Sequence, residues 1–186
     1  NASFGLNGTP VAPAFNNTST GILTNAGAFI VTMPGIALNN SGVVSVNDGT
    51  LRLSATTFTN FGTIQIAAGK ALDLLNTTTN LNGNTSITGS GILSLSGGTT
   101  NIQFLVQIPS GVTVNFSSGV IQGVNTMRFL NASTLNWSGG ELKGLAKTEI
   151  NSGAILNISG TVGLRESHWI ENNGTINWNS AGSIVY

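Results

Sequence analysis

The sequence predicts an all-β fold, a single-stranded parallel β-helix (β-solenoid) with about 21 residues per coil, three short strands per coil and roughly seven to eight coils. Three observations predict this fold. Apolar residues recur at a constant interval of 21 positions. They form apolar–polar–apolar triplets, and a period of two marks a strand with one buried face. Gly, Asn and Ser, which favour turns, separate the triplets.

The first strand of each coil gives the clearest pattern, because both of its inward positions are apolar in coil after coil. The first position is held by Leu51, Leu72, Leu93, Val114, Leu135 and Leu156, and the second by Leu53, Leu74, Leu95, Phe116, Trp137 and Ile158. A last coil, one residue shorter, adds Ile176 and Trp178. This ladder predicts that both Trp137 and Trp178 lie in the core.

Two further strands complete each predicted coil. The second strand is marked by Val46, Ile66, Ile87, Ile108, Phe129, Ile150 and Ile170, and the weaker third strand by Phe58, Thr79, Thr100, Ile121, Leu142 and Gly163. Since neighbouring coils stack at about 4.8 Å, like positions meet above one another and bury continuous columns that no single coil could bury alone.

The position between the two inward residues of the first strand points outward. It is occupied in turn by Arg52, Asp73, Ser94, Asn115, Asn136, Asn157 and Asn177. Stacking predicts an ion pair between Arg52 and Asp73 and a ladder of amide hydrogen bonds along the asparagines. On the second strand it predicts an ion pair between Arg128 and Glu149.

The two ends differ from the middle. Residues 1–20, with two prolines, fit the repeat poorly and are predicted to be an N-terminal cap or lead-in, so the repeat array covers 21–186. The array stops inside a coil, at Ser183, Ile184, Val185 and Tyr186. No polar cap follows in the sequence, and natural proteins rarely leave such a strand edge exposed. We therefore expect this assembly edge to stack on further repeats or on another subunit.

Composition excludes several classes of partner. Charged residues make up 6% of the chain, and Lys+Arg equal Asp+Glu, so there is no basic surface for nucleic acid. No apolar run has the length of a membrane span, and there is no Cys for a disulfide. No spacing of His, Cys or Asp predicts a metal site, and no cofactor is expected.

The repeats resemble those of large secreted bacterial β-helix proteins. The stretches that carry the resemblance are 133–140 (STLNWSGG) and 172–178 (NNGTINW), within a likeness that covers roughly residues 21–186. Filamentous-haemagglutinin-like adhesins and autotransporter passengers are the most similar families. The resemblance implies a right-handed β-helix, an extracellular or cell-surface location, and a role as a stalk or adhesive surface.

An enzyme that degrades polysaccharides is a third alternative, because many right-handed β-helices are such enzymes. The two aspartates, Asp48 and Asp73, are too few for a calcium site. The other candidates gather late in the chain: Glu141, Lys143, Lys147, Glu149, Arg165, Glu166, His168 and Glu171. Stacking places Lys147 near His168 and Glu149 near Glu171, and carboxylates about 5 Å apart match a retaining glycosidase. We expect these residues to be solvated charges on the final coils and the protein not to be an enzyme.

The second alternative is a protein that binds ice or polysaccharide through an outer face. Thr and Asn recur on one strand, at Thr113, Asn115, Thr134, Asn136, Asn157, Thr175 and Asn177, and Ile155 interrupts the Thr column. Trp169 is the predicted exposed aromatic for stacking on sugars. The preferred hypothesis remains an extracellular structural or adhesive rod whose partners are adjacent repeats or copies of itself, with surface glycans or ice as further candidates.

Overall fold

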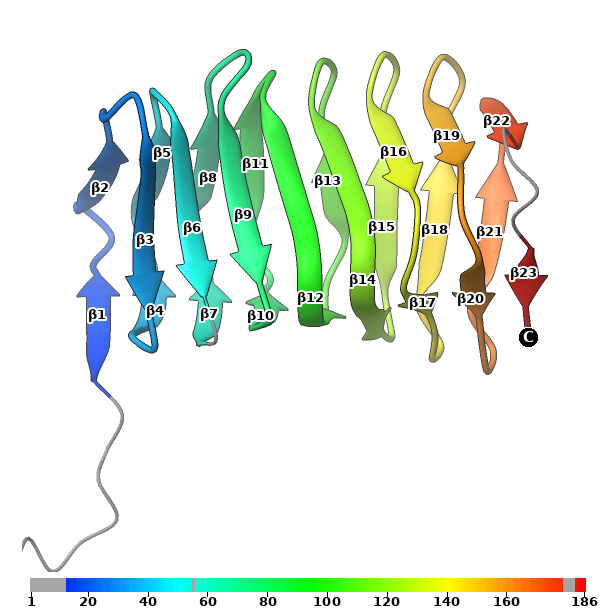
Figure 1. The fold of residues 1–186 in the computed structure, drawn as a ribbon, viewed down its shortest axis with the longest axis horizontal. Helices are drawn as coiled ribbons and strands as arrows, with labels where there is room; N and C mark the ends of the chain where they lie inside the picture. Colours follow the sequence, from blue (N-terminus) through cyan, green and yellow to red (C-terminus); the bar gives the residue numbers. More distant parts are fainter. Residues whose placement is uncertain (1–12, 55, 179–182) are drawn as a thin grey trace, which may run out of the picture.

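The computed structural model describes residues 13–54, 56–178 and 183–186, and these form a β-solenoid of about eight coils without any helix. All of its strand pairs are parallel. In Figure 1 the front strands run downward and the rear strands upward while the chain advances from left to right, so the coils are right-handed. The predicted fold class is confirmed.

Each coil contributes one strand to each of three faces. Face 1 contains β3 (Ile30–Pro34), β6 (Thr50–Ser54), β9 (Ala71–Leu75), the first halves of β12 (Ile92–Ile102) and β14 (Thr113–Gly123), β16 (Thr134–Trp137), β19 (Ile155–Ile158) and β22 (Thr175–Trp178). Face 2 contains β1 (Ala14–Asn17), β4 (Ala37–Asn40), β7 (Thr57–Asn60), β10 (Thr77–Leu81), the second halves of β12 and β14, β17 (Glu141–Leu142), β20 (Val162–Leu164) and β23 (Ile184–Val185). The two faces form one sheet because β12 and β14 bend from one into the other.

Face 3 is divided into two sheets of four strands. The first contains β2 (Ile22–Asn25), β5 (Val43–Val46), β8 (Thr63–Ile66) and β11 (Ser86–Gly89). The second contains β13 (Val106–Ile108), β15 (Thr126–Phe129), β18 (Lys147–Ile150) and β21 (Trp169–Asn172). No pairing joins β11 to β13, and Figure 1 shows a wider gap between them than between the other strands at the rear.

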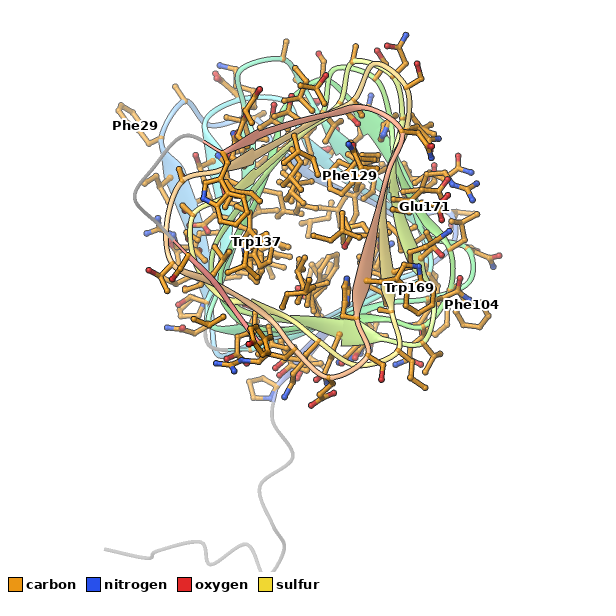
Figure 2. All side chains as sticks on the ribbon, turned by 90° about the vertical axis from the view of Figure 1, so that its right-hand side faces the viewer. Phe29, Phe104, Phe129, Trp137, Trp169 and Glu171 are labelled. Atoms are coloured by element: carbon orange, nitrogen blue, oxygen red, sulfur yellow. The ribbon has the colours of Figure 1, made fainter. Side chains whose placement is uncertain are left out.

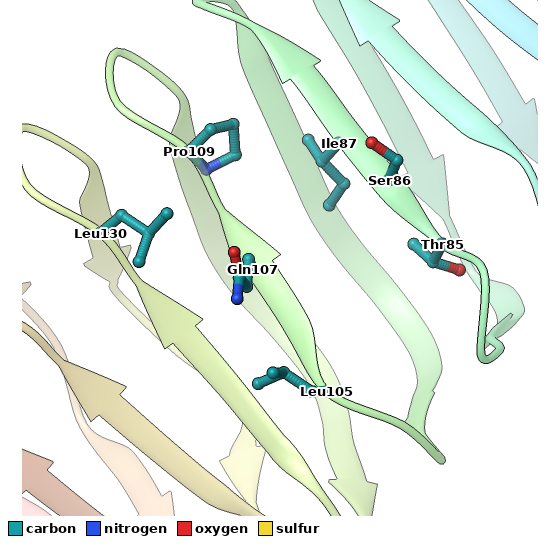
Figure 3. A pocket seen from close by; sticks show the side chains of 7 residues that line it. All are labelled: Thr85, Ser86, Ile87, Leu105, Gln107, Pro109 and Leu130. Atoms are coloured by element: carbon teal, nitrogen blue, oxygen red, sulfur yellow. The ribbon is translucent and has the colours of Figure 1, made fainter.

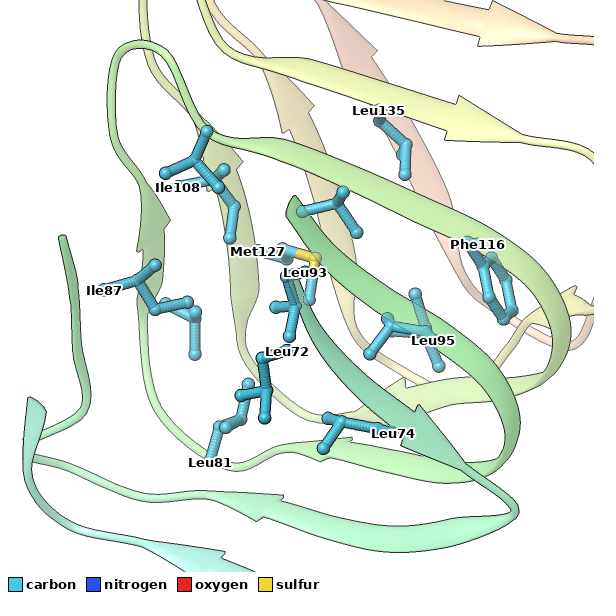
Figure 4. Packing of buried hydrophobic residues seen from close by; sticks show 14 of the residues in the cluster. Leu72, Leu74, Leu81, Ile87, Leu93, Leu95, Ile108, Phe116, Met127 and Leu135 are labelled. Atoms are coloured by element: carbon cyan, nitrogen blue, oxygen red, sulfur yellow. The ribbon is translucent and has the colours of Figure 1, made fainter. Parts of the chain in front are cut away.

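The core is a bundle of apolar columns that runs along the axis (Figures 2 and 4). The first-strand ladder is confirmed, since Leu72, Leu93 and Val114 pair in register and are buried. Trp137 is fully buried and stacks on Phe116, with 6.4 Å between the ring centroids. Burying each such side chain stabilises the fold by roughly 1.5–3 kcal/mol.

Trp178 is not a core residue, contrary to the prediction. Its side chain is 51% exposed, although it occupies the same inward column as Trp137. The reason is its place in the fold. It lies on β22, which pairs with β19 on one side only, so no described coil covers the other side of the indole.

Three register predictions were also wrong. Ile87 pairs with Ile64 rather than Ile66. Ile170 pairs with Thr148 rather than Ile150. Leu164, and not Gly163, continues the column of Leu142. In each case the coil is longer than the 21-residue period, because extra residues are accommodated at the corners.

A ladder of asparagines is buried at the corner between faces 2 and 3. The Asn17 amide donates to Asn40 Oδ1 at 2.7 Å, and the Asn40 amide donates to Asn60 Oδ1 at 2.6 Å. Because buried amides are costly unless they are hydrogen-bonded, the stack satisfies each one through its neighbours. Strand β1, in which Asn17 lies, falls within the segment predicted as a lead-in, and residues 1–12 of that segment lie outside the described part of the chain.

Candidate functional site

The predicted asparagine ladder runs along the outside of face 1. The Asn136 amide donates to Asn115 Oδ1 at 2.9 Å, the Asn157 amide donates to Asn136 Oδ1 at 2.8 Å, and the Asn177 amide donates to Asn157 Oδ1 at 2.9 Å. Every bond therefore points toward the coil before. This direction fixes the orientation of each amide and leaves the NH₂ group of Asn115 at the start of the ladder.

The threonine column lies beside the asparagine ladder. Thr113 pairs with Thr134, Thr134 with Ile155, and Ile155 with Thr175, as the sequence predicts. Ile155 is exposed and interrupts the row of hydroxyl groups after two members. The outer surface of these coils is therefore mixed, with one apolar side chain among the hydroxyl and amide groups.

A hollow of about 560 Å³ lies in face 1, toward the N-terminal coils, and we call it the face-1 groove. Its lining comes from β3, β6, β9, β12, β14 and the corner that follows β16. The lining residues are Ile30, Thr50, Arg52, Ala71, Asp73, Leu75, Ser94, Ser96, Asn115, Ser117 and Ser138. Of the predicted binding residues, only Asn115 is among them.

The charged pair in the groove was predicted, but only as a check of the register. Arg52 Nε donates to Asp73 Oδ2 at 2.7 Å, and Ser96 donates its hydroxyl proton to Asp73 Oδ1. Asp73 points outward from its strand and is nevertheless 93% buried, because Arg52 and Ser96 cover it. The pair gives the groove one fixed cation and one fixed anion at its centre.

The serines along one wall of the groove were missed by the sequence analysis. Ser96, Ser117 and Ser138 are 21 residues apart and occupy the corner where face 1 turns into face 2. Their spacing was visible in the sequence. However, corner residues lie outside the apolar triplets on which the prediction relied, so nothing marked these serines as the wall of a groove.

Three of the late charged residues, Lys147, Glu149 and Glu171, form an ion-pair network with Arg128 on face 3. Lys147 Nζ lies 3.1 Å from Glu149 Oε2 and 2.9 Å from Glu171 Oε2, and Arg128 Nη2 lies 3.1 Å from the same Glu149 oxygen. The Arg128–Glu149 pair is the second predicted ion pair. The Lys147 ammonium holds the pKa of the Glu171 carboxyl below its usual value. A glycosidase acid needs the opposite, a raised pKa.

His168 is buried and has two partners. Its Nε2 lies 3.0 Å from the Thr148 hydroxyl, and its Nδ1 lies 3.3 Å from the Lys143 carbonyl. The carbonyl can only accept, so Nδ1 carries the proton and Nε2 accepts from Thr148. Desolvation lowers the pKa of the imidazole. The prediction placed His168 beside Lys147, but the register pairs Lys147 with Trp169 instead.

Trp169 lies at the outer surface of face 3, in the last described coil of that face (Figure 2). Its side chain is 51% exposed, which agrees with the prediction that it is accessible. It is far from the face-1 groove, because the two lie on different faces of the solenoid. Lys147 and Glu171 on β18 and β21 are its polar neighbours.

A second, smaller hollow lies where face 3 divides (Figure 3). It has a volume of about 210 Å³ and is lined by Thr85, Ser86, Ile87, Leu105, Gln107, Pro109 and Leu130. It follows from the missing pairing between β11 and β13.

Within the described ranges, no three His, Cys, Asp or Glu residues gather to hold a metal ion. No helix of the described chain has the length and apolarity needed to cross a membrane.

Together these features define a β-solenoid repeat protein with a polar groove on one face. A scan against models of known protein families found no match. Searches of curated proteins and of solved structures found no match either.

Proposed function

We propose that the protein is a structural module, a rigid rod segment of an extracellular or cell-surface adhesin that stacks on further coils at its ends. The observation that carries this proposal is the exposure of the inward columns at both ends. Val31 at one end is 43% exposed and Ile176 at the other is 38% exposed, whereas the members of this column between them are buried. Apolar side chains that continue a core column are stabilised by another coil.

The strand edges at the two ends support the proposal. Among the described strands, β3 pairs only with β6 and β22 only with β19, so each presents an edge that no described strand covers. Natural proteins blunt such edges with charged residues. Here residues 13–47 contain no charged side chain, and β21–β23 contain only Glu171. Edges of this kind favour pairing with another strand.

The assembly edge contributes apolar groups to the same end. Ser183 and Tyr186 flank β23, which is Ile184–Val185, and Val185 and Tyr186 are exposed.

The likeness of the repeats to filamentous-haemagglutinin-like and autotransporter-passenger sequences supports the extracellular, adhesive part of the proposal. The proposal assigns the chain no catalysis, and the ion pairing of both Glu149 and Glu171 with Lys147 supports this.

The test compares two charges at the C-terminal end. Ile176→Asp places a carboxylate in the inward column, and Thr175→Asp places one on the outward side of the same strand as a matched control. We expect small-angle X-ray scattering of the wild-type chain to show particles that lengthen with concentration without thickening. Ile176→Asp should keep them short, and Thr175→Asp should lengthen like the wild type.

Two results would contradict the proposal. Wild-type particles of constant length up to millimolar concentration would disprove end-to-end stacking. Labelled antibodies that find the protein only inside the producing cells would disprove the extracellular role.

A further inference from the structure

We propose that the face-1 groove is a binding site for a neutral, extended polysaccharide. The proposal is independent of the rod function, because the groove lies on the side of the solenoid and not at its ends. It also differs from the face predicted from the sequence, since the groove begins at β3 and contains Asn115 as the only member of the Thr–Asn columns.

The shape of the groove fits a linear ligand. Its volume of about 560 Å³ lies within the range of about 300–1,000 Å³ that is typical of ligand sites. The lining residues span six coils, from Ile30 to Ser138, and five steps of about 4.8 Å give a length of about 24 Å. A site that extends over six coils along the axis suits a chain molecule rather than a compact one.

The side chains in the groove determine the chemistry of that chain. Ser94, Ser117 and Ser138 present hydroxyl groups, which both donate and accept hydrogen bonds. A matching ligand needs donors and acceptors along its whole length, and sugar hydroxyls provide both. Ala71 and Leu75 lie on β9, on either side of Asp73 and one coil before Ser94, and offer apolar contact for the C–H face of a sugar ring.

The charges in the groove favour a neutral ligand. Arg52 and Asp73 are 2.7 Å apart and compensate each other, so the groove does not attract a polyanion or a polycation. Arg52 uses Nε for Asp73, and a guanidinium has five N–H donors, so its terminal nitrogens remain for ligand hydroxyls. The pairing also holds the guanidinium in place before a ligand arrives, which reduces the entropy lost on binding.

Asn115 supplies a second donor that is held in place. Its Oδ1 accepts from Asn136, so the amide cannot rotate freely and its NH₂ group faces the groove. Among the described residues, no carbonyl or side chain accepts from this NH₂ group. Hydrogen bonds in a chain polarise one another, so the ladder from Asn177 to Asn115 strengthens this donor.

Other extended ligands fit less well. A peptide in extended form binds by pairing with the edge of a sheet. The strands that cross the middle of the groove, such as β9 and β12, are already paired on both sides and offer no edge. The flat array of threonines that would suit ice is also absent, since the groove is concave and charged at its centre.

The experiment measures binding of neutral hexasaccharides of β-1,4-linked glucose, mannose and xylose and of α-1,4-linked glucose by isothermal titration calorimetry. Ser117→Phe fills the groove, and Ser159→Phe makes the same change at the same corner position two coils later, outside the groove. We expect at least one neutral hexasaccharide to bind the wild type with a Kd below about 1 mM. Ser117→Phe should weaken this binding at least tenfold, and Ser159→Phe should leave it unchanged.

Three results would overturn the proposal: no binding of any neutral hexasaccharide at millimolar concentration, binding of hexagalacturonate alone, or equal binding by Ser117→Phe and Ser159→Phe. Circular dichroism shows whether each variant folds. If Ser117→Phe does not fold, Ser138→Phe blocks the C-terminal end of the groove one coil later, and retained binding in that variant overturns the proposal equally.

Discussion

Leu93 illustrates how a single side chain is held in this fold. It is 1% exposed, with Leu72 on the coil before it and Val114 on the coil after it. A side chain in this position is enclosed by neighbouring coils and not by distant parts of the chain. Its removal leaves a cavity that neither neighbour can fill by a small rotation.

We therefore expect Leu93→Ala to lower the free energy of unfolding by about 2–5 kcal/mol. Urea denaturation followed by circular dichroism measures this change. Thr134→Ala, on the outward side of a nearby coil, is the control and should change the free energy of unfolding much less. Equal effects of the two substitutions would show that the columns do not carry the stability.

His168 makes the stability depend on pH. Its folded-state pKa is lowered from 6.5, so the unfolded chain takes up a proton before the folded one does. The neutral imidazole contributes its full share to the free energy of unfolding above about pH 6.5. This share is lost as the pH falls from 6.5 toward the lower folded-state pKa. We expect the thermal unfolding midpoint of the wild type to fall between about pH 7 and pH 5.

The control for this pH dependence is His168→Gln, which does not titrate. The thermal unfolding midpoint of this variant should not fall between about pH 7 and pH 5. The lowered pKa values of Asp48 and Glu171 act in a separate, more acidic range, because their ordinary values are 3.8 and 4.5. If the thermal unfolding midpoint of His168→Gln fell over the same pH range as that of the wild type, groups other than His168 would cause the pH dependence.

At the scale of the strand, the division of face 3 has an identifiable cause. Leu130 N donates to Ile108 O at 3.0 Å, and the register places Pro109 at the position equivalent to Leu130 one coil earlier. Proline has no N–H, so this donor to the coil before is lost. Strand β13, which follows the gap after β11, therefore begins the second sheet of face 3.

Hydrogen exchange should detect this gap. Ser86 N and Ser90 N donate to the coil before, at Gly62 and Ile66, so the amides of Ile87 and Gly89 point toward β13, with which β11 does not pair. We expect these two amides to exchange faster than those of Met127 and Phe129, which point toward the paired strand β18. Equal protection, measured by NMR, would mean that the two sheets are joined in solution.

The sequence predicted face 1 well and face 3 poorly, for a physical reason. A slip of two residues leaves every side chain on the same side of a strand, so the apolar pattern cannot reveal it. Ile87 and Ile170 both slipped by two, remained inward and kept the predicted pattern. The face-1 groove could not be predicted because its wall is built from corner serines, whose position depends on how the backbone turns.

At the scale of the whole molecule, the chain depends little on charge. Only 6% of its residues are charged, and most of its ion pairs are partly exposed, so each contributes about 0–1 kcal/mol. We expect the thermal midpoint at neutral pH to change less between low salt and about 0.5 M salt than it does on Leu93→Ala. If calorimetry showed that the thermal midpoint falls strongly at about 0.5 M salt, the ion pairs and not the apolar columns would hold the coils together.

The asparagine ladder on face 1 makes that face of the rod electrically asymmetric, whereas the buried corner ladder of Asn17, Asn40 and Asn60 points the other way. Each amide dipole on face 1 points the same way along the axis, as do those of Asn101 and Gln122 on face 2. Aligned amides add, as they do in a helix, with the positive end toward the N-terminal coils. When two rods pack side by side through these faces, the antiparallel arrangement is therefore favoured over the parallel one. Electron micrographs of bundled material would show neighbouring rods with alternating polarity.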